Sequence, residues 1–451
     1  MFAGQPSWGE RRRSVVLFVK WGSIGHAALN GLESLLYNPL FYLILVVMLW
    51  DRTRNSKFER RFFGVRVSKV WLPWLRRFAA GLLIGAFASI VLMVAGVVVQ
   101  PITVWVLTGI TIILALIRLR FSATGYGLAI LLAVSLAGRM LPLHSYGTFS
   151  GQVGAFLSAV DVDSWMGIAA VLFLVEALWL RLHKQSSFAP AVVTSKRGRS
   201  MGAAVLQLPL LLPVVVLAPG HYALPSGLPH SWPWVGTLPG EFTLVGIPIL
   251  AGFSAVLLTV RSEDAVQLTA KTSLMTGVLL ALDAVAVHEF GIVFGWIGIL
   301  VMVLGRELPV WWLRHRENRN DPLFAPSMEG VRILATREGS LGEKMGLLPA
   351  ELVTHVNQVP VHSNYDLHFA FDQNPAYAKL QVVDRQGEAR IVGKPVYTGE
   401  LNQLGLILAP DQPLAASYHK PQIGLLQTIY LRTEPPTKAL PMAIEDSTSQ
   451  T

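Results

Sequence analysis

Long apolar stretches separated by short polar segments fill most of the chain up to residue 305. The hydrocarbon core of a bilayer is about 30 Å thick, so a helix needs roughly 20 apolar residues to cross it. The pattern therefore predicts an all-α polytopic transmembrane region over 34–305, with about 8–10 helices. The stretches at 124–138 and 203–218 are short for a span. The predicted spans are 34–50, 78–98, 101–117, 124–138, 164–182, 203–218, 242–260, 272–287 and 290–305.

The segment before the first span has a mixed pattern. Residues 1–33 form a predicted amphipathic N-terminal segment. Lys20, His26 and Asn30 interrupt its apolar run at 14–31. Such interruptions favour a helix that lies in the membrane interface over one that crosses the bilayer.

The overall composition supports lipid as part of the solvent. Hydrophobic residues make up 52% of the 451 residues and charged residues only 14%, whereas a soluble protein carries about 25% charged residues. The net charge of +9 fits basic loops on one side of a membrane and does not require nucleic acid as a partner. The chain has no cysteine, which excludes disulfides, iron–sulfur clusters and thiolate zinc sites.

Lysine and arginine are distributed unevenly among the loops. Eighteen lie in four loops, namely 51–77, 118–125, 181–203 and 261–271. The alternate loops 138–163 and 219–241 hold only Arg139. This asymmetry predicts that the first set of loops and the segment after residue 305 face the cytoplasm. Nine spans would leave the N-terminus outside, where the basic residues at 11–13 are unfavourable. A tenth span at 14–31, or one miscounted short span, would resolve that conflict.

The pattern changes near residue 315. A basic linker is predicted over 306–326, and residues 327–410 alternate between apolar and polar positions in the manner of half-buried strands. These residues predict a small α+β domain. Residues 411–451 are polar and contain prolines, which predicts a disordered tail. Within the domain we expect strands at 330–334 and 378–383, a hairpin at 384–387, and a short helix from Ser363 or Asn364 to Phe371.

Three motifs in this domain resemble those of bacterial PDZ domains. They are Gly330-Val331-Arg332-Ile333, the loop from Gly339 to Leu347, and the run from Glu351 to Val361, with departures at Leu341-Gly342, Met345 and Gln358. The resemblance implies a partly open β-barrel with short helices that binds an extended peptide as an added strand beside 330–334. Packing against neighbouring parts of the protein is the alternative. The predicted groove residues are Gly330, Val331, Arg332, Ile333, His368 and Phe371.

One sequence resembles part of a catalytic motif. His288-Glu289 begins the His-Glu-x-x-His pattern of zinc proteases, but Ile292 stands where the second histidine ligand is required. A polar turn between two apolar segments is therefore expected there. No catalytic set and no cofactor-binding motif was found, so we expect no enzyme activity, metal or cofactor.

Other polar residues interrupt or border the apolar stretches. Asp283 lies within an apolar run, which raises the hypothesis of a proton or ion path. A carboxyl group solvated near the headgroups, or bonded to a neighbouring helix, is the simpler interpretation. Asp161 and Asp163 are expected to be solvated loop residues. His221 and His230 lie in a predicted outer loop, where metal binding is a minor alternative.

The order of the parts narrows the family. Asn38-Pro39-Leu40-Phe41-Tyr42 opens the first span, and a basic segment over 52–67 follows it. A second basic segment, 314–318, precedes the PDZ-like domain, which closes with 396–407. This order resembles the MinJ-type cell-division topological determinants of spore-forming Gram-positive bacteria. The resemblance is clearest over the first 70 residues and over 310–410.

The resemblance implies a membrane adaptor. Such proteins link a DivIVA-like polar coiled-coil protein to a MinD-like ATPase, and so place the Min division inhibitor at poles and septum. It implies a multi-pass protein of the cell membrane with a cytoplasmic PDZ domain, enriched at septum and poles. A membrane scaffold for secretion, motility or envelope stress is the alternative. An intramembrane protease or a transporter fits less well, because a second metal ligand and an internal repeat are missing.

Overall fold

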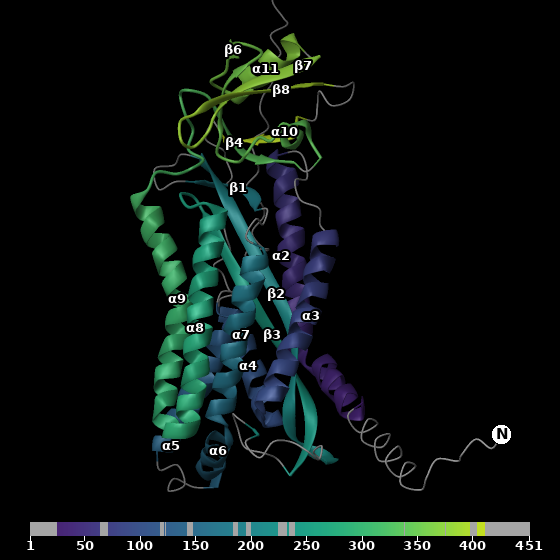
Figure 1. Cartoon of the computed structure of the whole chain (residues 1–451), viewed down its shortest axis with the longest axis vertical. Coiled ribbons are helices and arrows are strands. Elements are labelled where there is room, and N and C mark those ends of the chain that lie inside the picture. Colours follow the sequence, from purple (N-terminus) through teal and green to yellow (C-terminus); the bar gives the residue numbers. More distant parts are fainter. Residues whose placement is uncertain are drawn as a thin grey trace, which may run out of the picture.

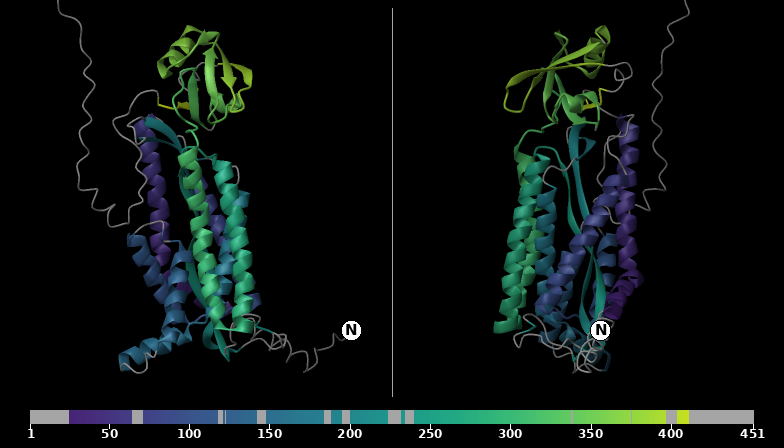
Figure 2. Two further views of the ribbon diagram at one scale, coloured as in Figure 1. Left: turned by 90° about the vertical axis from the view of Figure 1, so that its left-hand side faces the viewer. Right: turned by 45° about the vertical axis from the view of Figure 1, so that its right-hand side comes forward.

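The computed structural model describes residues 25–63, 71–117, 121, 123–141, 148–183, 188–194, 200–223, 232–233, 240–337, 339–374, 376–396 and 404–410. Long helices and two long strands run side by side along the long axis of the molecule, and a small α+β domain covers one end (Figure 1). Two further views show the same separation of the two parts (Figure 2). The predicted order, a helical membrane region followed by a small α+β domain, is confirmed.

The membrane region contains four helical stretches that are long and apolar enough to cross a bilayer, among the residues that the structure describes. They are α3, α7, α8 and Ile292–Glu317, and the bent pair Gly25–Tyr37 and Pro39–Trp50 makes a fifth if it counts as one span. These helices identify a membrane protein. The helices are α2 (Pro39–Phe63), α3 (Trp71–Ala95), α4 (Pro101–Ile117), α5 (Thr124–Met140), α6 (Thr148–Ala159), α7 (Val162–Leu182), α8 (Ser262–Phe290), the 3-10 turn η3 (Ile292–Phe294) and α9 (Gly295–Arg319).

The first predicted span, 34–50, is broken near its start. The helix Gly25–Tyr37 meets α2 at an angle of 59°. Asn38 stands at the break, where its Oδ1 accepts the Leu40 N–H at 3.0 Å and its Nδ2 donates to Thr108 Oγ1 of α4 at 3.0 Å. Pro39 begins α2, a position at which proline needs no N–H partner. The Asn-Pro pair therefore starts a new helix.

Two predicted helical spans, 203–218 and 242–260, are wrong because these segments are strands. They belong to a three-stranded antiparallel sheet of order β1-β2-β3, with β1 (Ala189–Thr194), β2 (Ser200–Ala223) and β3 (Glu241–Leu257). Pro213 of β2 and Pro248 of β3 face each other in register. A proline inside a helix costs about 3 kcal/mol, whereas an outward-facing position on an edge strand accepts it.

Two backbone N–H groups at the edges of the β2–β3 ribbon donate to side chains of neighbouring helices. Unpaired backbone polar groups in hydrocarbon cost several kcal/mol each, which is why open sheet edges are avoided there. The facing prolines have no N–H to satisfy. At the next outward-facing pair, the Val215 N–H donates to Ser89 Oγ of α3 at 2.8 Å. Its partner across the ribbon, Gly246, donates its N–H to Ser34 Oγ at 2.7 Å.

Helix α3 lies directly on the free edge of β2. A Cβ at Gly81 would lie 2.2 Å from the carbonyl oxygen of Leu211, and one at Gly85 would lie 2.5 Å from that of Pro213. Both glycines thus permit a contact that any side chain would prevent. The spacing of small residues that commonly joins two membrane helices here joins a helix to a strand edge.

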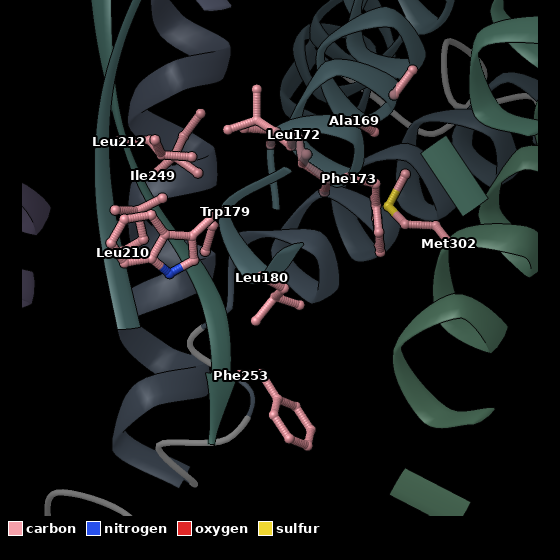
Figure 3. Packing of buried hydrophobic residues seen from close by; sticks show 14 of the residues in the cluster. Ala169, Leu172, Phe173, Trp179, Leu180, Leu210, Leu212, Ile249, Phe253 and Met302 are labelled. Carbon is pink, nitrogen blue, oxygen red and sulfur yellow. The ribbon is translucent and has the colours of Figure 1, made fainter. Parts of the chain in front are cut away.

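Helix α7 forms the centre of the membrane region. Its side chains contact the ribbon on one side and α9 on the other, and Figure 3 shows Trp179 beside Leu210 and Phe173 beside Met302. Trp179 and Phe173 are almost fully buried. A helix with apolar contacts on several faces is typical of the interior of a large bundle.

The α+β domain contains one sheet of order β8-β7-β5-β4-β9, with β6 paired to β5. The predicted helix and the predicted hairpin are both present, as α11 and as the turn between β7 and β8. The antiparallel strands and short helices confirm the predicted α+β class and are consistent with a PDZ-like domain. The elements are β4 (Val331–Thr336), α10 (Leu341–Lys344), β5 (Leu352–Val356), β6 (Val359–Pro360), α11 (Asn364–Gln373), β7 (Tyr377–Val383), β8 (Ala389–Pro395) and β9 (Leu406–Leu408).

The domain is packed against the membrane region. A Cβ at Gly202 of β2 would lie 2.8 Å from Leu334 of β4 and 2.7 Å from Phe324. The Leu323 N–H donates to the carbonyl of Leu258 at 2.8 Å. One buried cluster includes these domain residues and the membrane core. The connection is thus a packed contact, and α9 extends to Arg319 into the predicted linker. The predicted tail, 411–451, lies outside the described residues.

Candidate functional site

The strand that was predicted to line a peptide groove lies inside the sheet. β4 pairs with β5 along one side and with β9 along the other, so both of its edges are occupied. Val331 and Ile333 are buried in the domain core, and Arg332 is half-buried, which lowers the pKa of its guanidinium. A Cβ at Gly330 would lie 2.4 Å from the carbonyl oxygen of Val353. These four residues therefore belong to the sheet or border it. No open strand edge lies beside them to which a peptide could add.

The other two predicted site residues are on α11 and have different surroundings. Phe371 is buried in the same core cluster as Val331 and Ile333. His368 is exposed. The structure thus brings Phe371 together with β4 and leaves His368 at the surface, where it can contact a ligand.

The first turn of α11 is fixed by a capping box. Ser363 Oγ accepts the Asp366 N–H at 3.1 Å, and Asp366 Oδ2 accepts the Ser363 N–H at 2.9 Å. The same carboxylate accepts the His362 N–H at 3.0 Å. These hydrogen bonds, led by that from His362, hold the pKa of Asp366 below its ordinary value. They stabilise the charged carboxylate at the helix start.

The depressed pKa of Asp366 predicts a loss of stability in acid. The charged Asp366 carboxylate contributes to the free energy of unfolding above the unfolded-state pKa of about 3.9. This contribution is lost as the pH falls through the lower pKa of the folded state. Asp366→Asn should remove this part of the acid sensitivity, measured as thermal unfolding of the detergent-solubilised chain between about pH 3 and pH 7. Asp372→Asn, at the other end of α11, is the control. An equal change in that variant would contradict the prediction.

The sheet ends in β8 on one side and in β9 on the other, and β9 is the terminal strand beside α11. β9 is the last strand in the order, and its far side pairs with no strand among the described residues. On the near side, the Ala409 N–H donates to Arg332 O at 2.8 Å. Because main-chain groups alternate between the two sides of a strand, those of Leu406 and Leu408 point to the far side. We call this far side of Leu406–Leu408 the β9 edge.

The β9 edge lies next to α11. Asn364 Nδ2 donates to the carbonyl oxygen of Ala409 at 3.5 Å. His368 follows Asn364 by four residues, so it lies on the same face of α11. Gly405 precedes the strand with φ +62°, a left-handed conformation that favours glycine. The apolar run Leu404-Gly405-Leu406-Ile407 is a local signal for this strand, although in the sequence it was assigned only to the end of the domain.

A cleft of about 240 Å³ lies where the domain meets the membrane region. Its charged lining includes Arg261 and Glu263 from the start of α8, and Glu351 and Arg385 from the domain. Burial and the nearby Arg261 lower the pKa of Arg385, and Glu263 opposes this shift. Arg385 also donates to the carbonyl of Pro349. The mixed charges compensate one another, which suits a contact between the two parts better than an anion site.

His288 of α8 lies beside a carboxylate of α7. His288 Nδ1 lies 3.0 Å from Asp163 Oδ2. No group of three potential metal ligands was found among the residues that the structure describes. Asp163, expected to be solvated, is buried in the first turn of α7. The expected turn after His288 is present, because α8 ends at Phe290.

The remaining predicted polar residues are separate from one another. Asp283 lies between α8 and α9, where a Cβ at Gly298 would lie 2.0 Å from its Oδ2. The glycine therefore accommodates the carboxyl group within the helix pair. His221 is exposed at the end of β2, and His230 lies outside the described residues.

Similarity to known proteins covers most of the chain. No protein-family model matches it. It is 26% identical over 400 residues to the cell division topological determinant MinJ of Bacillus subtilis (strain 168), a match that covers 87% of this chain and 97% of the relative. It is 27% identical over 399 residues to a protein of Lacticaseibacillus paracasei named "Probable cell division topological determinant MinJ", covering 84% and 98%.

This chain is a relative of the MinJ-type proteins.

The match to the MinJ relatives includes both parts of the molecule. Coverage of 84–87% of the chain is too large to arise from the membrane region or from the α+β domain alone. The names of the MinJ relatives describe a topological determinant of cell division. The β9 edge is the feature of this MinJ relative that best suits protein binding.

Proposed function

We propose that this protein is a multi-pass membrane adaptor that holds a partner protein on the β9 edge and thereby helps to place a Min-type division inhibitor at poles and septum. The observation that carries the proposal is the open strand edge beside α11, on a domain that is fixed to a membrane region. An extended segment of a partner can add to such an edge through main-chain hydrogen bonds. Its side chains would contact the exposed His368 and the face of α11 around it.

The α+β domain faces the cytoplasm in this proposal. Support comes from basic residues at the helix ends on the domain side of the molecule. They include Arg181 in the last turn of α7, Arg261 before α8, and Arg316 and Arg319 in the last turn of α9. Loops rich in lysine and arginine are retained on the cytoplasmic side during insertion.

The mechanism is tethering and needs no covalent chemistry. Confinement to the membrane raises the effective concentration of a weakly bound partner, so modest contacts are sufficient. The resemblance to MinJ-type proteins suggests a DivIVA-like coiled-coil protein and a MinD-like ATPase as the two partners. One would use the β9 edge, and the other would use a different cytoplasmic surface. The packed contact between the domain and the membrane region fixes the orientation of the β9 edge relative to the rest of the protein.

The variant Leu408→Pro tests the β9 edge. Proline removes the N–H that points to the open side, and leaves the near-side bond from Ala409 to β4. We expect roughly tenfold less partner in crosslinked co-purification, as loss of about 1.4 kcal/mol would produce. A fluorescently tagged chain should lose its enrichment at septum and poles.

The matched control is Leu408→Ala. It removes the leucine side chain but keeps the N–H, so it separates lost packing from lost edge pairing. Recovery of partner and localisation should resemble those of the unmodified chain. If both variants behave alike, or if the unmodified chain is spread evenly in the membrane, the proposal is wrong.

A further inference from the structure

The chain itself contains a candidate occupant for the β9 edge. Residues 411–451 follow the end of the domain directly. Within them, Gln422–Arg432 reads Gln-Ile-Gly-Leu-Leu-Gln-Thr-Ile-Tyr-Leu-Arg and contains no proline. Isoleucine, threonine and tyrosine are enriched in strands. Pro421 precedes this segment and Pro435 follows it, so its length is that of a single bounded strand.

The position of this segment in the chain suits an antiparallel return. β9 ends at Leu408 and the described part of the domain at Pro410, and residues 411–421 then lead to the apolar segment. Neighbouring strands lie about 4.8 Å apart, and antiparallel strands need only a short connection. Eleven residues are ample for the chain to reverse beside β9. A second apolar stretch at 439–444 is less suitable, because Pro441 interrupts it.

We propose that Gln422–Arg432 adds to the β9 edge of the same chain as an antiparallel strand, and that a partner must displace it to bind. This inference rests on the proposed use of the β9 edge for partner binding. A short connection keeps the segment at an effective concentration on the order of millimolar. The tail segment therefore occupies the β9 edge until a partner at high local concentration displaces it. Such a concentration is reached where partner molecules accumulate, so the tail sets a threshold for recruitment.

A labelled synthetic peptide with the sequence of residues 420–434 is the probe. Its binding is measured by fluorescence anisotropy to the full chain and to a chain ending at Pro410, both in lipid nanodiscs. The shortened chain should bind the peptide, and the full chain should bind it at least about tenfold more weakly because its own tail competes. Equal binding by the two chains would overturn the proposal. Absence of binding to the shortened chain would overturn it as well.

Two double variants of the full chain test whether the sequence of residues 422–432, and not the mere presence of a tail, weakens peptide binding. The double variant Leu425→Asp and Ile429→Asp places charges on one side of the predicted strand and should bind the peptide as the shortened chain does. The control, Ala439→Asp with Met442→Asp, adds the same charge elsewhere in the tail and should behave as the unmodified chain. If the control also opens the site, the effect comes from charge and the proposal is overturned.

The location of binding is tested separately. Leu408→Pro in the shortened chain should abolish peptide binding, and unchanged binding would place the peptide elsewhere and overturn the inference. Failure of the proposed function has a different signature, namely recovery of partner protein that is unaffected by Leu408→Pro. The two proposals can therefore fail independently.

Discussion

Replacement of Glu176 by alanine is expected to destabilise the membrane region by about 3–5 kcal/mol. Glu176 of α7 is fully buried, and its Oε1 accepts from Arg306 Nη1 of α9 at 2.7 Å. Its Oε2 lies 2.6 Å from Arg306 Nη2 in the same ion pair. The guanidinium also lies 4.6 Å from the ring centre of Phe173. Without the carboxylate, a nearly buried positive charge would lose its compensating partner. Unfolding in mild detergent, followed by tryptophan fluorescence against denaturant, measures the change.

Two further variants make this prediction specific. Glu307→Ala removes the next carboxylate along α9, which is only half-buried and accepts from Tyr126 Oη at 2.7 Å, so it should have a much smaller effect. The double variant Glu176→Ala with Arg306→Leu removes both charges and should recover much of the lost stability. If Glu176→Ala and Glu307→Ala are equally mild, the ion pair does not hold α7 to α9.

Hydropathy located the apolar segments but could not assign all of their conformations. A bilayer-length apolar run has no polar face, so its periodicity does not separate a helix from a strand. The segments 203–218 and 242–260 were therefore predicted to be helices. The strand conformation places Pro213 opposite Pro248, and this depends on a pairing register between two distant segments. The sequence of either segment alone does not specify that register.

The α+β domain was predicted better than its site. Local signals were sufficient for α11, because Ser363 and Asp366 lie within one turn, and for the hairpin before β8. The choice of β4 as the binding strand stays a prediction, and both edges of β4 are paired. β9 comes more than 60 residues after β4 and occupies its outer side. Which strands end a sheet follows from long-range pairing, so the sequence motif predicted the domain but not that β9 is a terminal strand beside α11.

Replacement of Gly85 by alanine is expected to destabilise the membrane region by about 2–5 kcal/mol. The new Cβ would lie 2.5 Å from the carbonyl oxygen of Pro213, which is backbone and cannot rotate away. Helix α3 would have to move from β2, and the bond from the Val215 N–H to Ser89 Oγ would lengthen or break. An unsatisfied N–H in the interior adds about 1–3 kcal/mol to the strain.

Gly109→Ala is the matched control for this substitution. Gly109 lies in α4, and a Cβ there would meet nothing within 4 Å. Alanine should be neutral or stabilising by roughly 0.5–1 kcal/mol at that position, because it is the better helix former. Opposite signs for the same chemical change would show that close contact with the strand edge, and not helix propensity, determines the effect. Equal effects at the two positions would mean that close packing of α3 against the edge of β2 does not contribute to stability. The backbone groups of β2 would then need other hydrogen-bond partners within the bilayer.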